Sequence, residues 1–124
     1  MRILLISPDL MSTSKLAGLA RDADGLLETL RSLNEKPRSD NYDLVLLDLQ
    51  AFRDDPAVLV AKVCVLLDSL PQKNKFMKVV AFGPHVHKQR LDDAVAAGVD
   101  ESVSRGELFG SFPALLRRWL PSLP

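Results

Sequence analysis

The segment Leu44-Val-Leu-Leu-Asp48 decides the fold class of this chain, because four apolar residues run without a break and stop at an acidic one. Two further runs have the same character, Ile3-Leu-Leu-Ile6 before Ser7-Pro8 and Lys78-Val-Val-Ala-Phe82 before Gly83-Pro84. Short continuous apolar runs bounded by turn residues indicate strands that are buried on both faces. Such strands are typical of parallel sheets that carry helices above and below.

Helical periodicity fills the intervals between these runs. The spacing of the apolar residues predicts helices over about 12–22, 55–70 and 87–97, and a last helix from Glu107 or Ser111 to Leu120. The residues expected to face the core from these helices are Leu16, Leu19, Ala20, Leu59, Val63, Leu66, Leu67, Leu91, Ala94, Val95, Phe109, Phe112 and Leu116.

Capping residues mark the ends of these helices. Ser12 or Thr13 is the expected cap of the first helix, and Asp55 suits the cap of the second, with Pro56 in its first helical position. Gly98 suits the C-terminal turn of the third helix.

The interval 23–41 is ambiguous. Leu26-Leu-Glu-Thr-Leu30 suits either an edge strand or a continuation of the first helix, and 34–41 suits a solvated connection with at most a short helix. A fifth strand is expected over Glu101-Ser-Val103. Strand and helix therefore alternate about five times, which predicts an α/β flavodoxin-like sandwich of three layers, with a five-stranded parallel sheet in the order 2-1-3-4-5.

Composition narrows the classes of function. The 124 residues suit one domain spanning 1–124, and sixteen Lys and Arg residues balance sixteen Asp and Glu residues. A neutral domain lacks the positive field that captures nucleic acid or anionic membranes, so neither is an expected partner. The sequence shows no signal-peptide core or membrane span, and a cytoplasmic location is expected. The single cysteine, Cys64, lies in an apolar run and is predicted to be a buried thiol.

Ligands of open α/β sheets bind outside the carboxyl ends of the strands. In this sequence those ends are Ser7-Pro-Asp9, Asp48-Leu-Gln50, Gly83-Pro-His-Val-His87 and Ser104-Arg-Gly106. These four segments hold the candidate functional residues.

Three stretches carry a resemblance to a known family: Tyr42-Asp-Leu-Val-Leu-Leu-Asp48, Lys78-Val-Val-Ala-Phe82, and Arg90-Leu-Asp-Asp-Ala-Val-Ala-Ala-Gly-Val-Asp100 leading into Val103-Ser-Arg105. Over nearly its whole length the chain resembles the CheY-like receiver domain of two-component response regulators. The resemblance implies that Asp48 occupies the position of the phosphoacceptor aspartate.

The resemblance also implies a set of site residues, most of which are replaced here. Ser7 and Pro8 stand where the family has the acidic pair that holds Mg²⁺, and Gly83 stands where it has a hydroxyl residue. Arg105 replaces the lysine after the fifth strand, and Gly106 replaces the proline that follows it. A metal site would therefore depend on Asp48 with the neighbouring Asp9, or on Asp54 and Asp55 if their loop folds back.

Two interpretations of Asp48 remain open. It is either a phosphoacceptor with Arg105 as a charge clamp, or a residue that orders the turn after the third strand and pairs with Arg105. Loss of the metal ligands removes the largest electrostatic contribution to phosphoryl transfer and favours the second. The sequence thus predicts a pseudo-receiver, not an enzyme and without a cofactor, that acts through protein contacts. The alternatives are a working single-domain response regulator phosphorylated on Asp48, and a flavodoxin-like domain that binds a small ligand.

His85 and His87 suit either a transition-metal site with Asp48 or another carboxylate as third ligand, or a solvent-facing loop. Other catalytic motifs are missing: the sequence has no glycine-rich phosphate loop and no G-x-S-x-G elbow, and Cys64 is a poor nucleophile if buried.

A protein-binding face is implied by the resemblance, on the helix after the fourth strand, the fifth strand and the last helix. A sensor kinase, an output protein or a second copy of the chain is the expected partner there. Trp119 is expected either to seal the core or to anchor a partner. The residues of this face are His87, Lys88, Gln89, Asp92, Asp93, Ser102, Arg117 and Arg118.

Overall fold

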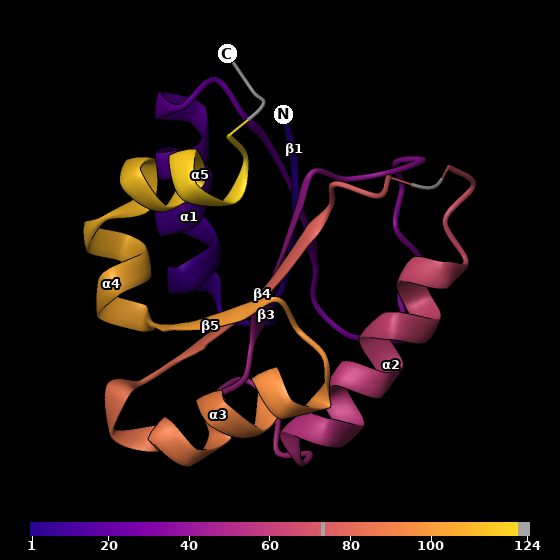
Figure 1. Ribbon diagram of the computed structural model, residues 1–124. Helices are drawn as coiled ribbons and strands as arrows, with labels where there is room; N and C mark the ends of the chain where they lie inside the picture. The colour runs from indigo at the N-terminus through magenta and orange to yellow at the C-terminus, as the bar shows by residue number, and fades with distance from the viewer. Residues whose placement is uncertain (73, 122–124) are drawn as a thin grey trace.

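The computed structural model describes residues 1–72 and 74–121, and within them five parallel strands form one sheet in the order β2-β1-β3-β4-β5 (Figure 1). The predicted fold class and strand order are confirmed. The strands are β1 (Arg2–Ile6), β2 (Leu26–Leu30), β3 (Leu44–Asp48), β4 (Lys78–Gly83) and β5 (Glu101–Ser104).

Helices cover both faces of this sheet, as continuous apolar strands require. Figure 1 shows α1, α4 and α5 gathered on the left and α2 on the right. The helices are α1 (Leu10–Asp22), α2 (Pro56–Asp68), α3 (Lys88–Ala97), α4 (Arg105–Gly110) and α5 (Phe112–Trp119), and a 3₁₀ turn, η1 (His85–His87), precedes α3. Of these described helices, none is long and apolar enough to cross a membrane.

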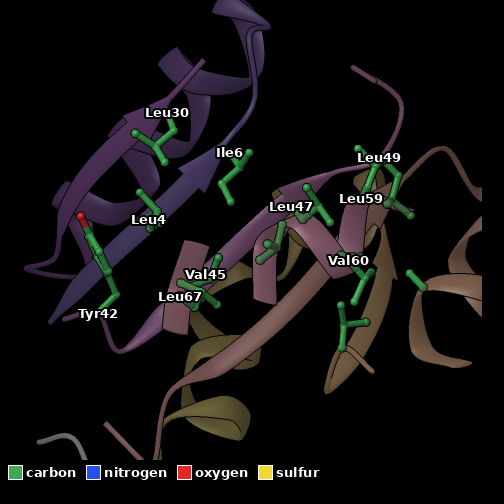
Figure 2. Close-up of a cluster of buried hydrophobic side chains, with 14 of the residues drawn as sticks. Leu4, Ile6, Leu30, Tyr42, Val45, Leu47, Leu49, Leu59, Val60 and Leu67 are labelled. Atoms are coloured by element: carbon green, nitrogen blue, oxygen red, sulfur yellow. The ribbon is translucent and has the colours of Figure 1, made fainter. Parts of the chain in front are cut away.

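Alternate residues of each central strand supply two apolar cores. Val45 and Leu47 of β3 face α2 and α3, while Leu44 and Leu46 face α1, α4 and α5. All five residues of β3 are buried, including Asp48. Figure 2 shows the first core, where Leu59, Val60 and Leu67 of α2 lie near β3.

Leu26–Leu30 forms the edge strand β2 and does not continue α1, which decides between the two predicted alternatives. The connection from β2 to β3 holds no helix in the described structure. Glu28 fixes this connection, because its carboxylate accepts hydrogen bonds from the Arg38 backbone N–H at 2.7 Å and from Ser39 Oγ at 3.1 Å. The Ser39 N–H in turn donates to the Tyr42 hydroxyl.

The start of α1 differs from the prediction. The helix begins at Leu10, and its cap is Asp9 in place of Ser12 or Thr13. The Asp9 carboxylate accepts from the N–H groups of Met11 and Ser12, each at 3.3 Å, which satisfies two of the free donors of the first turn. Asp55 does precede α2, but its side chain makes no capping hydrogen bond.

Two residues predicted to be buried are exposed. Cys64 lies on the outer side of α2, because the buried stripe of that helix runs through Leu59, Val63 and Leu67 and the next residue is rotated away by about 100°. Val95 is displaced in the same way from Leu91 and Ala94 of α3 and is 44% exposed.

The later of the two predicted starts of the last helix, Ser111, is confirmed, because α5 begins directly after it at Phe112. Arg105–Gly110 forms a separate helix, α4. Pro113 lies in the first turn of α5, where a missing N–H is tolerated. Trp119 seals the core: it is 4% exposed, and its indole N–H donates to Glu101 Oε1 at 3.2 Å. Arg118 also pairs with Glu101, so α5 is fixed to β5.

Candidate functional site

The carboxyl ends of β1, β3 and β5 bring Ser7, Asp48 and Arg105 together, as their places after the strands predicted. Asp48 is fully buried, and Ser7 Oγ donates to its Oδ2 at 2.8 Å. Ser7 Oγ also accepts from the Asp9 N–H at 3.1 Å. The hydroxyl therefore links the Asp48 carboxylate to the segment that starts α1.

Arg105 bridges two carboxylates. Its Nη2 lies 3.5 Å from Asp48 Oδ1, and its Nη1 lies 3.5 Å from Asp9 Oδ2. Nη1 also donates to Ser12 Oγ at 2.5 Å, and Ser12 Oγ donates to Asp9 Oδ2 at 2.6 Å. Nη2 makes a longer contact of 3.4 Å with Gln50 Oε1. The guanidinium is thus tied to the segments that follow β1 and β3.

Two aromatic rings support this guanidinium from α4 and β4. Its central carbon lies 5.7 Å from the ring centroids of Phe82 and of Phe109. Both distances are within the range of cation–π attraction. A planar cation suits such a position better than the compact ammonium of a lysine.

Asp9 is an ionised partner of this cation. The hydrogen bond from the Ser12 hydroxyl lowers the pKa of its carboxyl most; partial burial opposes that effect, and the N–H groups of Ser12 and Met11 and the charge of Arg105 add to it. The carboxylate therefore serves as helix cap and ion-pair partner at once.

Asp48 has an uneven environment. Oδ2 receives the Ser7 hydroxyl, but among the described residues Oδ1 has no hydrogen-bond partner and only the Arg105 contact at 3.5 Å. Leaving a buried carboxylate oxygen without a hydrogen bond costs stability. A neighbouring cation offsets this cost in part.

The magnesium ion that the fold implies does not fit these residues. Pro8 offers no side-chain oxygen, the Asp9 carboxylate is engaged by the helix and by Arg105, and the guanidinium lies between Asp9 and Asp48. Magnesium needs a nearly octahedral set of oxygen ligands and tolerates no fixed cation within it.

The other candidate ligands lie elsewhere. Asp54 pairs with Lys62 at 3.1 Å and does not turn toward Asp48, and Asp55 is exposed at the start of α2. His85 and His87 are exposed in η1. Across residues 1–72 and 74–121, no group of three or more His, Cys, Asp or Glu side chains is arranged to hold a metal ion.

Gly83 ends β4 on the same edge and is buried. A Cβ built on it would lie 3.8 Å from Leu49 Cβ and 3.8 Å from Leu91 Cδ2, which are ordinary contacts. The space around Gly83 would therefore accommodate a residue with a hydroxyl side chain.

Sequence reasoning missed three contributors to the site. Ser12 was predicted only as a cap, yet its hydroxyl connects Arg105 to Asp9. Gln50 lies in one of the four candidate segments but received no role, and Phe109 was predicted only to face the core; both contact the Arg105 guanidinium. Asp9 was named as a metal candidate, and the structure places it against Arg105.

No family model and no curated protein sequence matches this chain. Solved structures do. A two-component response regulator from Clostridium difficile superposes with a TM-score of 0.77 at 19% identity, over 98% of this chain and 96% of the other. The response regulator TrrA from Thermotoga maritima, solved in complex with Mg²⁺-BeF, gives 0.70 at 21% identity over 96% and 98%.

The receiver domain of a sensor histidine kinase from Pseudomonas aeruginosa, solved with a magnesium ion in its active site cleft, gives a TM-score of 0.72 at 13% identity over 97% of both chains. The similarity therefore includes receivers of response regulators and of histidine kinases. Over nearly its whole length this chain has the CheY-like fold of the response regulator receiver domains.

Proposed function

We propose that this domain is a pseudo-receiver of a two-component or phosphorelay system, which signals through protein contacts and does not use Asp48 as a phosphorylation switch. One observation carries the proposal: the Arg105 guanidinium lies between Asp9 and Asp48, 3.5 Å from an oxygen of each. A protein cation thus stands between the two carboxylates that a divalent metal would need.

Charge supports this proposal. Phosphoryl transfer to a carboxylate brings two anions together, and a metal ion ordinarily neutralises the charge of the moving group. With Ser7 and Pro8 after β1, the site loses two negative charges that would attract such an ion. We therefore propose that the domain is not an enzyme and holds no cofactor.

The residue that would transmit phosphorylation to the rest of the domain is also missing. In the receivers that this chain resembles, a hydroxyl after the fourth strand bonds the phosphoryl oxygen, and Gly83 has none. A phosphoryl group on Asp48 would consequently have no hydroxyl at this position to form a hydrogen bond with.

The face of α3, β5 and α5 is the proposed contact surface for a sensor kinase, an output protein or a second copy of the chain. It carries charge of both signs, with Lys88 paired to Asp92 at 2.8 Å and Gln89 bonded to Asp93 at 2.7 Å. Balanced charge suits a specific protein partner better than nucleic acid or a membrane.

A working receiver phosphorylated on Asp48 is the second candidate. It is favoured by Oδ1 of Asp48, which has no hydrogen-bond partner in the described structure and contacts only the Arg105 guanidinium. Such a reaction would proceed with Arg105 as the nearest cation.

Acetyl phosphate or beryllofluoride with Mg²⁺ separates the two candidates, with intact mass and amide NMR shifts as readouts. The pseudo-receiver should gain no phosphoryl mass and show no localised shifts around Asp48. Asp48→Asn is the matched control. A mass gain or a set of shifts that this variant abolishes would overturn the proposal.

A further inference from the structure

An open cavity of about 530 Å³ lies next to the Asp48 site, and Arg105 belongs to both. Its walls come from α1, from the connection between β4 and α3, and from α4. The volume falls within the range of small-molecule sites, roughly 300–1,000 Å³. The lining residues are Lys15, Pro84, His85, Arg105, Gly106, Phe109 and Gly110.

The charge of this lining has one sign. Lys15 and Arg105 are cationic, His85 adds an imidazole, and none of the lining residues is acidic. Lys15 Nζ has no ion-pair partner in the described part of the chain, and it lies 5.4 Å from the Phe109 ring centroid. Asp9 and Asp48 contact Arg105 but do not line the cavity.

Two glycines keep the cavity open. Gly106 and Gly110 are one turn apart on α4, and a Cβ built on either would meet nothing within 4 Å. Alanine favours a helix more than glycine does, so the fold itself gains nothing from glycine at these positions. Both glycines line the cavity and are exposed.

We propose that this cavity binds a small organic anion, with a carboxylate or phosphate group against Lys15 and Arg105 and an apolar, flat body against Phe109 and Pro84. Charge complementarity selects the anionic group, and the aromatic and proline surfaces select an organic body over a bare inorganic ion. This proposal goes beyond the pseudo-receiver function, and the cavity shares Arg105 with the Asp48 site.

Position favours a small molecule over a peptide. The cavity lies at the carboxyl ends of parallel strands, where open α/β sheets bind their ligands. Its lining residues come from three separate segments of the chain and not from one continuous stretch.

Phenyl phosphate and benzoate are suitable probes, titrated into the ¹⁵N-labelled protein. We expect saturable amide shifts confined to Arg105–Gly110, His85 and the turn of α1 that carries Lys15. Inorganic phosphate supplies only the anionic group, and benzyl alcohol supplies only the aromatic body. Both should therefore bind at least several-fold more weakly than phenyl phosphate.

Two variants test the site. Lys15→Gln should weaken phenyl phosphate binding roughly tenfold, since it removes one charge-assisted contact. Gly110→Leu should abolish binding by filling the cavity, with a thermal midpoint no lower than that of the wild type. Lys62→Gln and Gly18→Ala are the matched controls outside the cavity, and binding should be unchanged in both.

Three results would overturn the proposal. One is a lack of saturable shifts with either probe. Another is an equal loss of binding in Lys62→Gln and Lys15→Gln, which would indicate attraction to overall charge. The third is binding of an acidic peptide to these amides while phenyl phosphate leaves them unchanged, which would make the cavity part of a protein interface.

Discussion

Nη2 of Arg105 lies 3.5 Å from Oδ1 of Asp48, a carboxylate that is fully buried. Among the described residues, Arg105 is the only charged side chain in contact with this carboxylate. The same guanidinium reaches Asp9 through Nη1. One side chain therefore links the ends of β1, β3 and β5, and the stability of the site depends on it.

Arg105→Gln should lower the free energy of unfolding by about 2–4 kcal/mol, because it leaves the buried Asp48 carboxylate without a cation. Urea unfolding measures this loss. The double variant Asp48→Asn with Arg105→Gln should lose less than the sum of the two single variants, since the unpaired charge is gone. Strict additivity would show that the two side chains are energetically independent.

Ser7→Ala should cost about 1–3 kcal/mol, because Oδ2 of Asp48 loses its hydroxyl donor inside the protein. Ser14→Ala, on the exposed side of α1, is the matched control and should change stability by less than about 0.5 kcal/mol. Equal effects of the two substitutions would contradict the role given to Ser7.

Asp9 gives stability a defined pH dependence. Its pKa in the folded state is lowered from the ordinary value of 3.8, chiefly by the Ser12 hydroxyl. The resulting stabilisation is fully present above pH 3.8, the value of the unfolded chain, and is lost as pH falls through the lower folded value.

Asp9→Asn isolates this effect, because asparagine retains the capping oxygen but carries no charge. The variant should be less stable than the wild type at pH 6, and the difference should shrink as the pH falls below 3.8. Asp9→Ala should cost about 1 kcal/mol for the loss of the cap. A difference between wild type and Asp9→Asn that does not change with pH would contradict the lowered pKa of Asp9, which the Ser12 hydroxyl causes most.

The order of the strands and the meeting of Asp48 with Arg105 were predictable from sequence, because continuous apolar runs fix the strands and parallel strands end on one edge. The role of Asp9 as the cap of α1 was not predictable from sequence. Asp, Ser and Thr have similar capping preferences, and only the packed structure selects one of them. Burial of Cys64 and Val95 was also predicted wrongly. Cys64 lies in α2, and the sequence of so apolar a helix does not show which of its faces the sheet covers. Val95 follows Ala94 of the buried stripe of α3 and is turned away from the core.

Cys64 offers a direct check of the α2 orientation. As an exposed thiol, it should react completely with a water-soluble disulfide reagent under native conditions, on the timescale of the urea-unfolded chain. Val63→Cys in a Cys64→Ser background is the control, because Val63 is only 1% exposed and its replacement should be protected until the protein unfolds. Protection of Cys64 would require a different rotation of α2 on the sheet.

Restoring the replaced residues tests the proposal that their loss prevents Mg²⁺ binding and phosphorylation. The combined variant Ser7→Asp, Pro8→Asp, Gly83→Ser and Arg105→Lys returns two acidic side chains, a hydroxyl and the compact cation. Gly83→Ser is sterically free, since the nearest atoms to a new Cβ lie at 3.8 Å. We expect this variant to bind Mg²⁺ by amide NMR and to gain a phosphoryl group from acetyl phosphate, where the wild type gains none.

The single variant Arg105→Lys separates two possible causes of weak Mg²⁺ binding, the guanidinium of Arg105 and the missing acidic pair. If the guanidinium between Asp9 and Asp48 is the main obstacle, the single change should already allow weak Mg²⁺ binding, because the shorter reach of an ammonium frees one carboxylate. If the missing acidic pair dominates, Mg²⁺ binding should appear only with Asp at positions 7 and 8. Full phosphorylation of the wild type would make both explanations unnecessary, because the native residues would then suffice.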